Sequence, residues 1–209
     1  MFTGSLMMGR SGVVTITYTV NPSQGAATVY TFSAADISTA AADRKIVVGI
    51  QANDGGNTVS SVTVGGISAS LVIALDDGNS RTELWQADVP TGTTADIVVT
   101  FSGGANACDI GVWAVYGAAA AAHHTASSSA NPPSANLNIP ANGVAIGVAR
   151  ENGSGVLSTW TNLTERFDRT SGTGASDAFV AAETGRTITC TPAAGGAEMP
   201  MVLASWAPA

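Results

Sequence analysis

Three aspartates in two glycine-rich segments are the first candidates for chemistry. Asp54 lies in Asn53-Asp54-Gly55-Gly56-Asn57, and Asp76 and Asp77 lie in Asp76-Asp77-Gly78-Asn79. Clustered carboxylates and amide carbonyls are ligands that Ca²⁺ accepts in proteins. The spacing of an EF-hand is missing, however, and Asp-Gly pairs form turns without any ion. We therefore predict no metal site and no cofactor, and keep Asp54, Asp76 and Asp77 as the alternative calcium ligands.

The acids and histidines do not form a recognisable catalytic set. Glu83 and Glu165 fall on predicted strands, where we expect them on solvent faces rather than facing each other as a glycosidase pair would. The adjacent His123 and His124 point to opposite faces of an extended chain, which disfavours a shared metal. The sequence has no G-x-S-x-G nucleophile motif. The prediction is that the protein is not an enzyme.

Aromatic and large apolar side chains suggest where a partner binds. Trp113 and Trp206 lie in apolar segments and are predicted to pack in the core. Trp160 has polar neighbours, so it is the candidate for a ligand or partner contact. The N-terminal arm, residues 1–12, carries four large apolar side chains without strand periodicity, and these are the candidate partner-binding residues: Phe2, Leu6, Met7 and Met8.

The elements that position these residues alternate between apolar and polar side chains with a period of two. In residues 14–20 the apolar side chains alternate with threonines, which is typical of a strand with one polar face. The other predicted strands are residues 46–50, 97–101, 110–116, 144–148, 163–167, 179–181, 188–190 and 201–203. Asx-Gly turns separate several of them: Asp54-Gly55, Asp77-Gly78, Asn142-Gly143 and Asn152-Gly153. A short helix at residues 33–42 is the one alternative element.

The chain repeats itself weakly. Residues 45–56 match residues 143–154, and residues 109–117 match residues 200–208. Because half a sandwich cannot bury both of its faces, we interpret the repeat as two interleaved halves of one double-sheet domain. The predicted fold is all-β, a jelly-roll-like β-sandwich over residues 13–209, with a crossover loop near residues 118–137.

Composition excludes several classes of protein. Only 11% of the 209 residues are charged, and the formal net charge is -7. This acidic balance argues against nucleic-acid binding, and no apolar stretch is long enough for a membrane span. The N-terminus lacks the pattern of a secretory signal, so we expect synthesis in the cytoplasm. Cys108 and Cys190 are predicted as buried thiols, with a single disulfide bridge as the alternative.

Three motifs carry a resemblance to a known group of proteins. They are TELWQADVPTGTTADIVVTF at residues 82–101, SVTVGGI at residues 61–67 and WTNLTER at residues 160–166. They resemble segments of β-rich structural proteins encoded by tailed phages, prophages and gene-transfer-agent-like clusters of alphaproteobacteria. The resemblance covers residues 30–208, and it assigns no catalytic residue.

This resemblance implies a virion structural protein, made in the host cytoplasm. The favoured expectation is a capsid decoration (cement) protein that binds and stabilises the assembled shell. Its expected partners are the major capsid protein, other virion subunits and further copies of itself. The alternative is a tail fibre, spike or adhesive module that binds a host surface glycan. Fold alone does not separate these functions.

Overall fold

The computed structural model describes residues 12–20, 22–78, 80–150, 158–169, 172–193 and 199–209. All regular secondary structure in these residues consists of β-strands, so the all-β prediction is confirmed. The N-terminal arm, apart from Gly12, and the predicted turn at Asn152-Gly153 lie outside the described residues.

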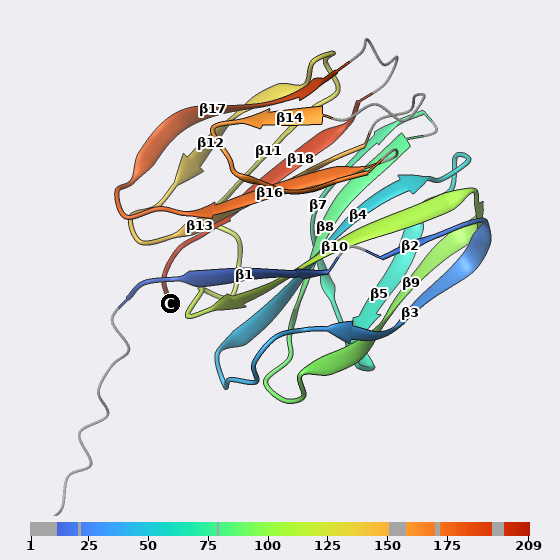
Figure 1. The fold of residues 1–209 in the computed structure, drawn as a ribbon, viewed down its shortest axis with the longest axis horizontal. Coiled ribbons are helices and arrows are strands. Elements are labelled where there is room, and N and C mark those ends of the chain that lie inside the picture. The colour runs from blue at the N-terminus through green and yellow to red at the C-terminus, as the bar shows by residue number, and fades with distance from the viewer. Residues whose placement is uncertain (1–11, 21, 79, 151–157, 170–171, 194–198) are drawn as a thin grey trace, which may run out of the picture.

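The strands form four antiparallel sheets, which we number in the order in which they stack (Figure 1). Sheet 1 has the order β3 (Ala27–Asp36), β9 (Thr94–Ala105), β5 (Val59–Val64) and β6 (Ile67–Ser68). Sheet 2 has the order β1 (Thr15–Val20), β10 (Ala107–Tyr116), β4 (Arg44–Asn53), β8 (Ser80–Asp88) and β7 (Ser70–Asp77), and β2 (Ser23–Gln24) also pairs with β10.

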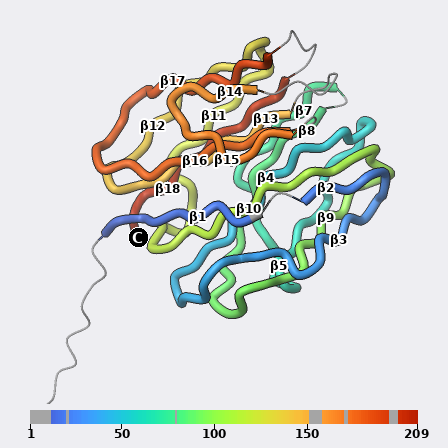
Figure 2. The backbone as a smooth tube through the Cα atoms, viewed as in Figure 1, coloured from blue at the N-terminus to red at the C-terminus, as the bar shows by residue number. Residues whose placement is uncertain are grey.

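The second half of the chain forms the other two sheets. Sheet 3 has the order β11 (His124–Ser128), β18 (Met201–Trp206), β13 (Val144–Ala149), β16 (Thr173–Ala178) and β15 (Glu165–Asp168). Sheet 4 has the order β12 (Ser134–Ile139), β17 (Glu183–Pro192) and β14 (Ser158–Thr161). Figure 2 shows the two halves of the chain as separate lobes that meet along sheets 2 and 3.

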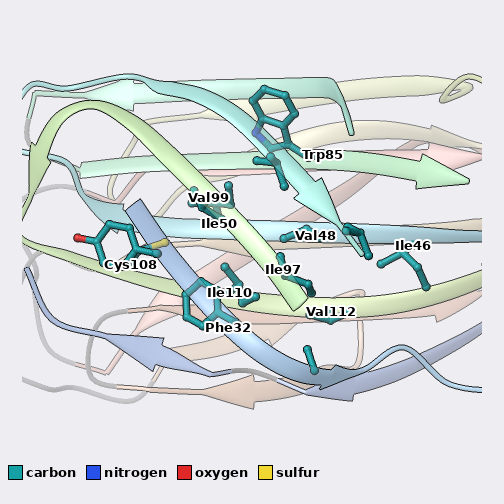
Figure 3. Packing of buried hydrophobic residues seen from close by; sticks show 14 of the residues in the cluster. Phe32, Ile46, Val48, Ile50, Trp85, Ile97, Val99, Cys108, Ile110 and Val112 are labelled. Carbon is teal, nitrogen blue, oxygen red and sulfur yellow. The ribbon is translucent and has the colours of Figure 1, made fainter. Parts of the chain in front are cut away.

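Apolar side chains fill all three spaces between the four sheets. Sheets 1 and 2 enclose the first core, to which Phe32, Ile50 and Ile110 belong (Figure 3). Sheets 3 and 4 enclose another, which includes Leu137 and Ile188. A third core lies between sheets 2 and 3 and joins the halves. The molecule is therefore two β-sandwiches packed against each other through their central sheets.

This arrangement confirms the sandwich and corrects the expected arrangement of the halves. The halves are not interleaved in one pair of sheets, because each half pairs its strands only within its own two sheets. The outer face of each central sheet is apolar, and the other sandwich buries it. Each half thus covers both faces of its central sheet, one internally and one against the other half. The jelly-roll-like strand order is not confirmed.

The helix considered as an alternative at residues 33–42 does not form, and the end of β3 and a loop occupy this segment. Ala34 and Ser38 have positive φ angles of 50° and 62°, which a right-handed helix does not tolerate. The side chain of Ile37 is fully buried. The guanidinium of Arg44 donates hydrogen bonds to the carbonyls of Ile37 and Ser38, at 3.0 and 2.8 Å. These contacts hold the segment in an irregular conformation.

Two further predictions, for residues 118–137 and 179–181, differ from the structure. The expected crossover loop near residues 118–137 contains β11, which pairs with β18, and the start of β12. Its polar, half-exposed residues give no apolar alternation by which β11 could be recognised. The strand predicted at residues 179–181 is a turn, because β16 ends at Ala178 and the amide of Phe179 donates to the carbonyl of Gly143 at 2.8 Å.

Candidate interaction surface

One carboxylate from each of the two glycine-rich segments, those of Asp54 and Asp76, contacts Arg81. The Arg81 guanidinium contacts Asp54 at 2.8 Å, Asp76 at 2.6 Å and Glu83 at 3.1 Å. Trp85 Nε1 donates a further hydrogen bond to Glu83 at 2.5 Å. Burial raises the pKa of the Glu83 carboxyl, although the bonds from Trp85 and Arg81 act in the opposite direction. An arginine therefore supplies the positive charge at this site.

The third calcium candidate, Asp77, lies at the end of β7 and pairs with Ser80. Within the described part of the chain, no three His, Cys, Asp or Glu side chains gather as metal ligands would. His123 is exposed, and the Nδ1 atom of His124 accepts a hydrogen bond from the amide of Asn138 at 3.3 Å.

The two glutamates considered as a catalytic pair lie in different sheets. Glu165 is exposed on β15 of sheet 3, as the expectation of a solvent face requires. Glu83 on β8 of sheet 2 is only 2% exposed, so the same expectation is wrong for this residue. Its ion pair with Arg81 compensates the burial of its charge.

Of the three tryptophans considered from the sequence, two lie in the core and one is partly exposed. Trp113 and Trp206 are fully buried, which confirms the core prediction. Trp160 is half-buried on β14, and its Nε1 donates to Thr173 Oγ1 at 2.9 Å. A Cβ atom added to Gly147 would lie 2.9 Å from the Trp160 ring, so that ring packs directly on the β13 backbone. A ligand contact at Trp160 stays a prediction for the exposed part of the ring.

Both cysteines are buried and unbridged, as expected. Cys108 belongs to the core of the first sandwich and Cys190 to that of the second. Burial raises the pKa of the Cys108 thiol well above its ordinary value, which keeps it protonated and unreactive.

The described surface has a cleft beside the C-terminus and the first described residues, which we call the termini cleft. Its volume is about 1210 Å³. It is lined by residues from the start of the described chain, the β3–β4 loop, the end of β10 and the C-terminus: Gly12, Val13, Thr15, Ala40, Ala41, Ala42, Asp43, Tyr116, Gly117 and Ala209. Most of these side chains are small, and Asp43 is the one charged side chain among them.

Backbone bonds fix the walls of the termini cleft. Gly117 has a φ of 71° and its added Cβ would lie 3.4 Å from the Val13 carbonyl, so this turn requires glycine. The amide of Ala209 donates to the carbonyl of Gly117 at 2.9 Å, which ties the C-terminus to the end of β10. The Tyr116 hydroxyl donates to the carbonyl of Thr39 at 2.8 Å and holds the opposite loop.

Two exposed valines lie near the termini cleft. Val13 is 47% exposed, and Val180, in the β16–β17 turn, is 86% exposed. They are connected through Asn142, whose carbonyl accepts from the Val14 amide at 2.8 Å and whose amide donates to the Val180 carbonyl at 3.2 Å. Two exposed apolar side chains thus lie close to the point where the described residues begin.

The predicted partner-binding residues Phe2, Leu6, Met7 and Met8 lie outside the described residues. Their attachment point is nevertheless defined, because Gly12 and Val13 line the termini cleft. The sequence indicated an apolar arm but gave no sign of the cleft, whose walls come from four segments that are distant in the sequence.

Lysine gives no protection to the sheet edges. Lys45 is the only lysine of the chain, and it is 3% exposed on β4, a central strand. Its Nζ atom contacts Asp88 at 2.7 Å. β-Proteins commonly place lysine on edge strands to prevent pairing with other chains, and that device is not used here.

No family model, curated protein or solved structure matches this chain. No helix in the described part of the chain is long and apolar enough to cross a membrane.

Proposed function

We propose that this protein is a virion structural protein of the capsid-decoration type, which binds an assembled shell and stabilises it. The observation that carries the proposal is the combination of an apolar arm with the termini cleft and the exposed Val13 and Val180 at its point of attachment. Exposed apolar surface of this kind is typical of a site for another protein.

The construction of the rest of the molecule supports a structural role. Three apolar cores are stacked between four sheets, and the central sheets bury both of their faces. The buried carboxylates of Asp54 and Glu83 are paired with Arg81, so these charges are balanced inside the protein. The phage resemblance of the three sequence motifs supplies the kind of assembly in which such a protein would act.

Quantitative mass spectrometry of particles purified from the source organism tests this proposal. We expect the protein in the particles, at a copy number comparable to that of the main shell subunit. A copy number that is a small fraction of the shell subunit would instead indicate a tail fibre or spike. Absence of the protein from purified particles would contradict both.

Removal of residues 1–10 tests the role of the arm within that function. The deletion chain should melt at nearly the same temperature as the full chain and bind stripped particles much more weakly. Full occupancy of particles by the deletion chain would show that the arm is not the anchor.

A further inference from the structure

We propose that the contact between the two sandwiches contains an internal water-binding site, in which ordered water molecules bridge buried side chains of sheet 2 to sheet 3. The site is formed by Gln51, Ser80 and Thr82 of sheet 2, beneath Gly172 of sheet 3. The virion role neither requires this site nor is required by it.

The three side chains of sheet 2 lie together on the face that packs against sheet 3. Gln51 on β4 follows Ile50, which belongs to the core between sheets 1 and 2, so the Gln51 side chain points to the opposite face. Thr82 on β8 is the direct cross-strand partner of Gln51. Ser80 and Leu84 share its face of β8, and Leu84 belongs to the core between the sandwiches.

These side chains are buried without a protein partner. Gln51, Ser80 and Thr82 are each 0% exposed. In the described part of the chain, four of their polar atoms make no hydrogen bond to another protein group: Nε2 and Oε1 of Gln51, Oγ of Ser80 and Oγ1 of Thr82. Buried polar groups are nearly always hydrogen-bonded to protein or to ordered water, because an unpaired group keeps the full penalty of its desolvation. A ligand that can pair with these atoms is therefore expected here.

The chemistry of the surrounding groups favours water as that ligand. Asp109 on β10 is the other cross-strand partner of Gln51, and it interacts electrostatically with Arg150, directly after β13 of sheet 3. The carboxylate disfavours an anion at this place, and the guanidinium disfavours a metal cation. An amide and two hydroxyls present both donors and acceptors, and water, which is uncharged, pairs with both kinds.

The close packing of sheet 3 on Gln51 fits single water molecules rather than a larger ligand. A Cβ atom added to Gly172 would lie 2.8 Å from the Gln51 Cβ atom and 3.2 Å from its Oε1. Directly opposed side chains of antiparallel strands have Cβ atoms about 5 Å apart, so one water molecule can reach both Gln51 and Thr82. Such water would add a polar contact between the sandwiches at the opposite end of β8 from Gln86, to which Trp206 donates.

A high-resolution crystal structure of the unmodified protein tests the site directly. We expect ordered water within about 3 Å of both Nε2 and Oε1 of Gln51. Anomalous scattering distinguishes water from a bound ion. A dry Gln51 amide would overturn the site, and so would an ion or a protein group bonded to both of its polar atoms.

The stability of Gln51→Met provides an independent measurement, because methionine has a similar length but no amide. If water satisfies the amide, the variant loses those bonds, and the equilibrium constant for unfolding at a fixed urea concentration should rise roughly fivefold. An unpaired, dry amide predicts the reverse, since its removal would stabilise the fold. A Gln51→Met chain that is more stable than the parent would therefore contradict the proposal.

A double-mutant cycle tests whether Gln51 and Thr82 share the water. Thr82→Val should also destabilise the fold, and the double variant should lose less than the sum of the two single losses, because the first change already disrupts the shared water. The matched control is Thr31→Val, since Thr31 is exposed on β3 of sheet 1 and its effect should add to that of Gln51→Met. Full additivity between Gln51→Met and Thr82→Val would show that no water bridges them.

Discussion

Arg81 is the residue on which the polar interior of the first sandwich depends. Its side chain is 8% exposed, and it contacts two nearly inaccessible carboxylates, those of Asp54 and Glu83. Asp76 adds a third contact from β7, with a more accessible side chain. Buried charges are tolerated when each is paired and hydrogen-bonded, and strongly destabilising when one partner is removed.

We therefore expect Arg81→Met to lower the free energy of unfolding by about 3–5 kcal/mol, because it leaves Asp54 and Glu83 buried without a cation. Urea denaturation followed by tryptophan fluorescence measures the change. The matched control is Arg186→Met, since Arg186 is more accessible and lies 3.6 Å from Glu183. That loss should be about 1 kcal/mol or less. Equal losses for the two variants would show that the Arg81 cluster does not stabilise the fold.

The sequence did not reveal this cluster because its residues have the pattern of an exposed strand. Arg81 and Glu83 alternate with Thr82 and Leu84, as charged residues do on a solvent face. In the structure β8 is buried on both faces, from Ser80 to Trp85. Asp54 was correctly placed in an Asp-Gly turn, since Gly55 has a φ of 59°, but its ion pair joins residues 27 positions apart. Side-chain partners across such separations do not follow from local pattern.

Among the elements, the facing strands of sheets 2 and 3 approach closely because of glycine. A Cβ atom added to Gly111 on β10 would lie 2.6 Å from the Phe167 ring, and one added to Gly174 on β16 would lie 2.5 Å from it. Phe167 therefore sits over glycine backbone from both sheets, with its ring centre 6.1 Å from that of Trp113 and 5.6 Å from that of Tyr18. The two glycines make room for this aromatic cluster between the sandwiches.

Gly111→Ala should therefore lower the free energy of unfolding by about 1–3 kcal/mol, the usual cost of adding a carbon to a filled core. Gly104→Ala is the control, because Gly104 lies on β9 and its added Cβ meets no atom within 4 Å. We expect no loss there, since alanine suits a strand at least as well as glycine does. Urea denaturation of both variants checks the difference. A Gly111→Ala protein as stable as Gly104→Ala would mean that the contact between the sandwiches adjusts freely.

The internal repeat predicted equivalent strands correctly, but its alignment pairs residues that lie on opposite faces of those strands. Residues 45–56 and 143–154 do contain the equivalent strands β4 and β13, each at the centre of its sheet. The sequence match aligns Val48 with Ile146, however, and Val48 faces sheet 1 whereas Ile146 faces the other sandwich. A shift of one residue exchanges the two faces of a strand, so similarity of apolar runs locates a strand without fixing its register.

At the scale of the whole molecule, the two sandwiches are held together by reciprocal tryptophans. Trp113 of sheet 2 donates to Ser176 of sheet 3 at 3.1 Å, and Trp206 of sheet 3 donates to Gln86 of sheet 2 at 2.8 Å. The sequence carried one sign of this packing: residues 46–50 and 144–149 are nearly continuous apolar runs, typical of strands buried on both faces. The alternation of apolar and polar residues predicted only two sheets. A central strand that is apolar on both faces needs a further sheet on each side, as the four stacked sheets provide.

The whole molecule is acidic, and the pKa shifts of the carboxyls in its described residues share one direction. The formal net charge is -7 at pH 7. In the described residues, the carboxyls with a resolved pKa shift all have a raised pKa, and burial is the largest cause for each: Asp76, Glu83, Glu165 and Asp168. A carboxyl with a higher pKa in the folded than in the unfolded state holds its proton more tightly when folded. Its contribution to stability is fully present below the unfolded pKa and is lost as the pH rises through the folded pKa.

We therefore expect the melting temperature to rise as the pH falls through the raised, folded pKa of these carboxyls toward their unfolded pKa values of about 4. Protonation at lower pH also reduces the number of negative charges. The weaker repulsion among them raises the melting temperature as well. Scanning calorimetry at several pH values measures the trend, with light scattering to exclude aggregation near the isoelectric point of about 4.5. Glu83→Gln should reduce the slope, because it removes the most deeply buried of the four groups. A melting temperature that falls steadily over the same range would mean that carboxylates stabilised in their charged form, with lowered pKa values, dominate the stability of this protein.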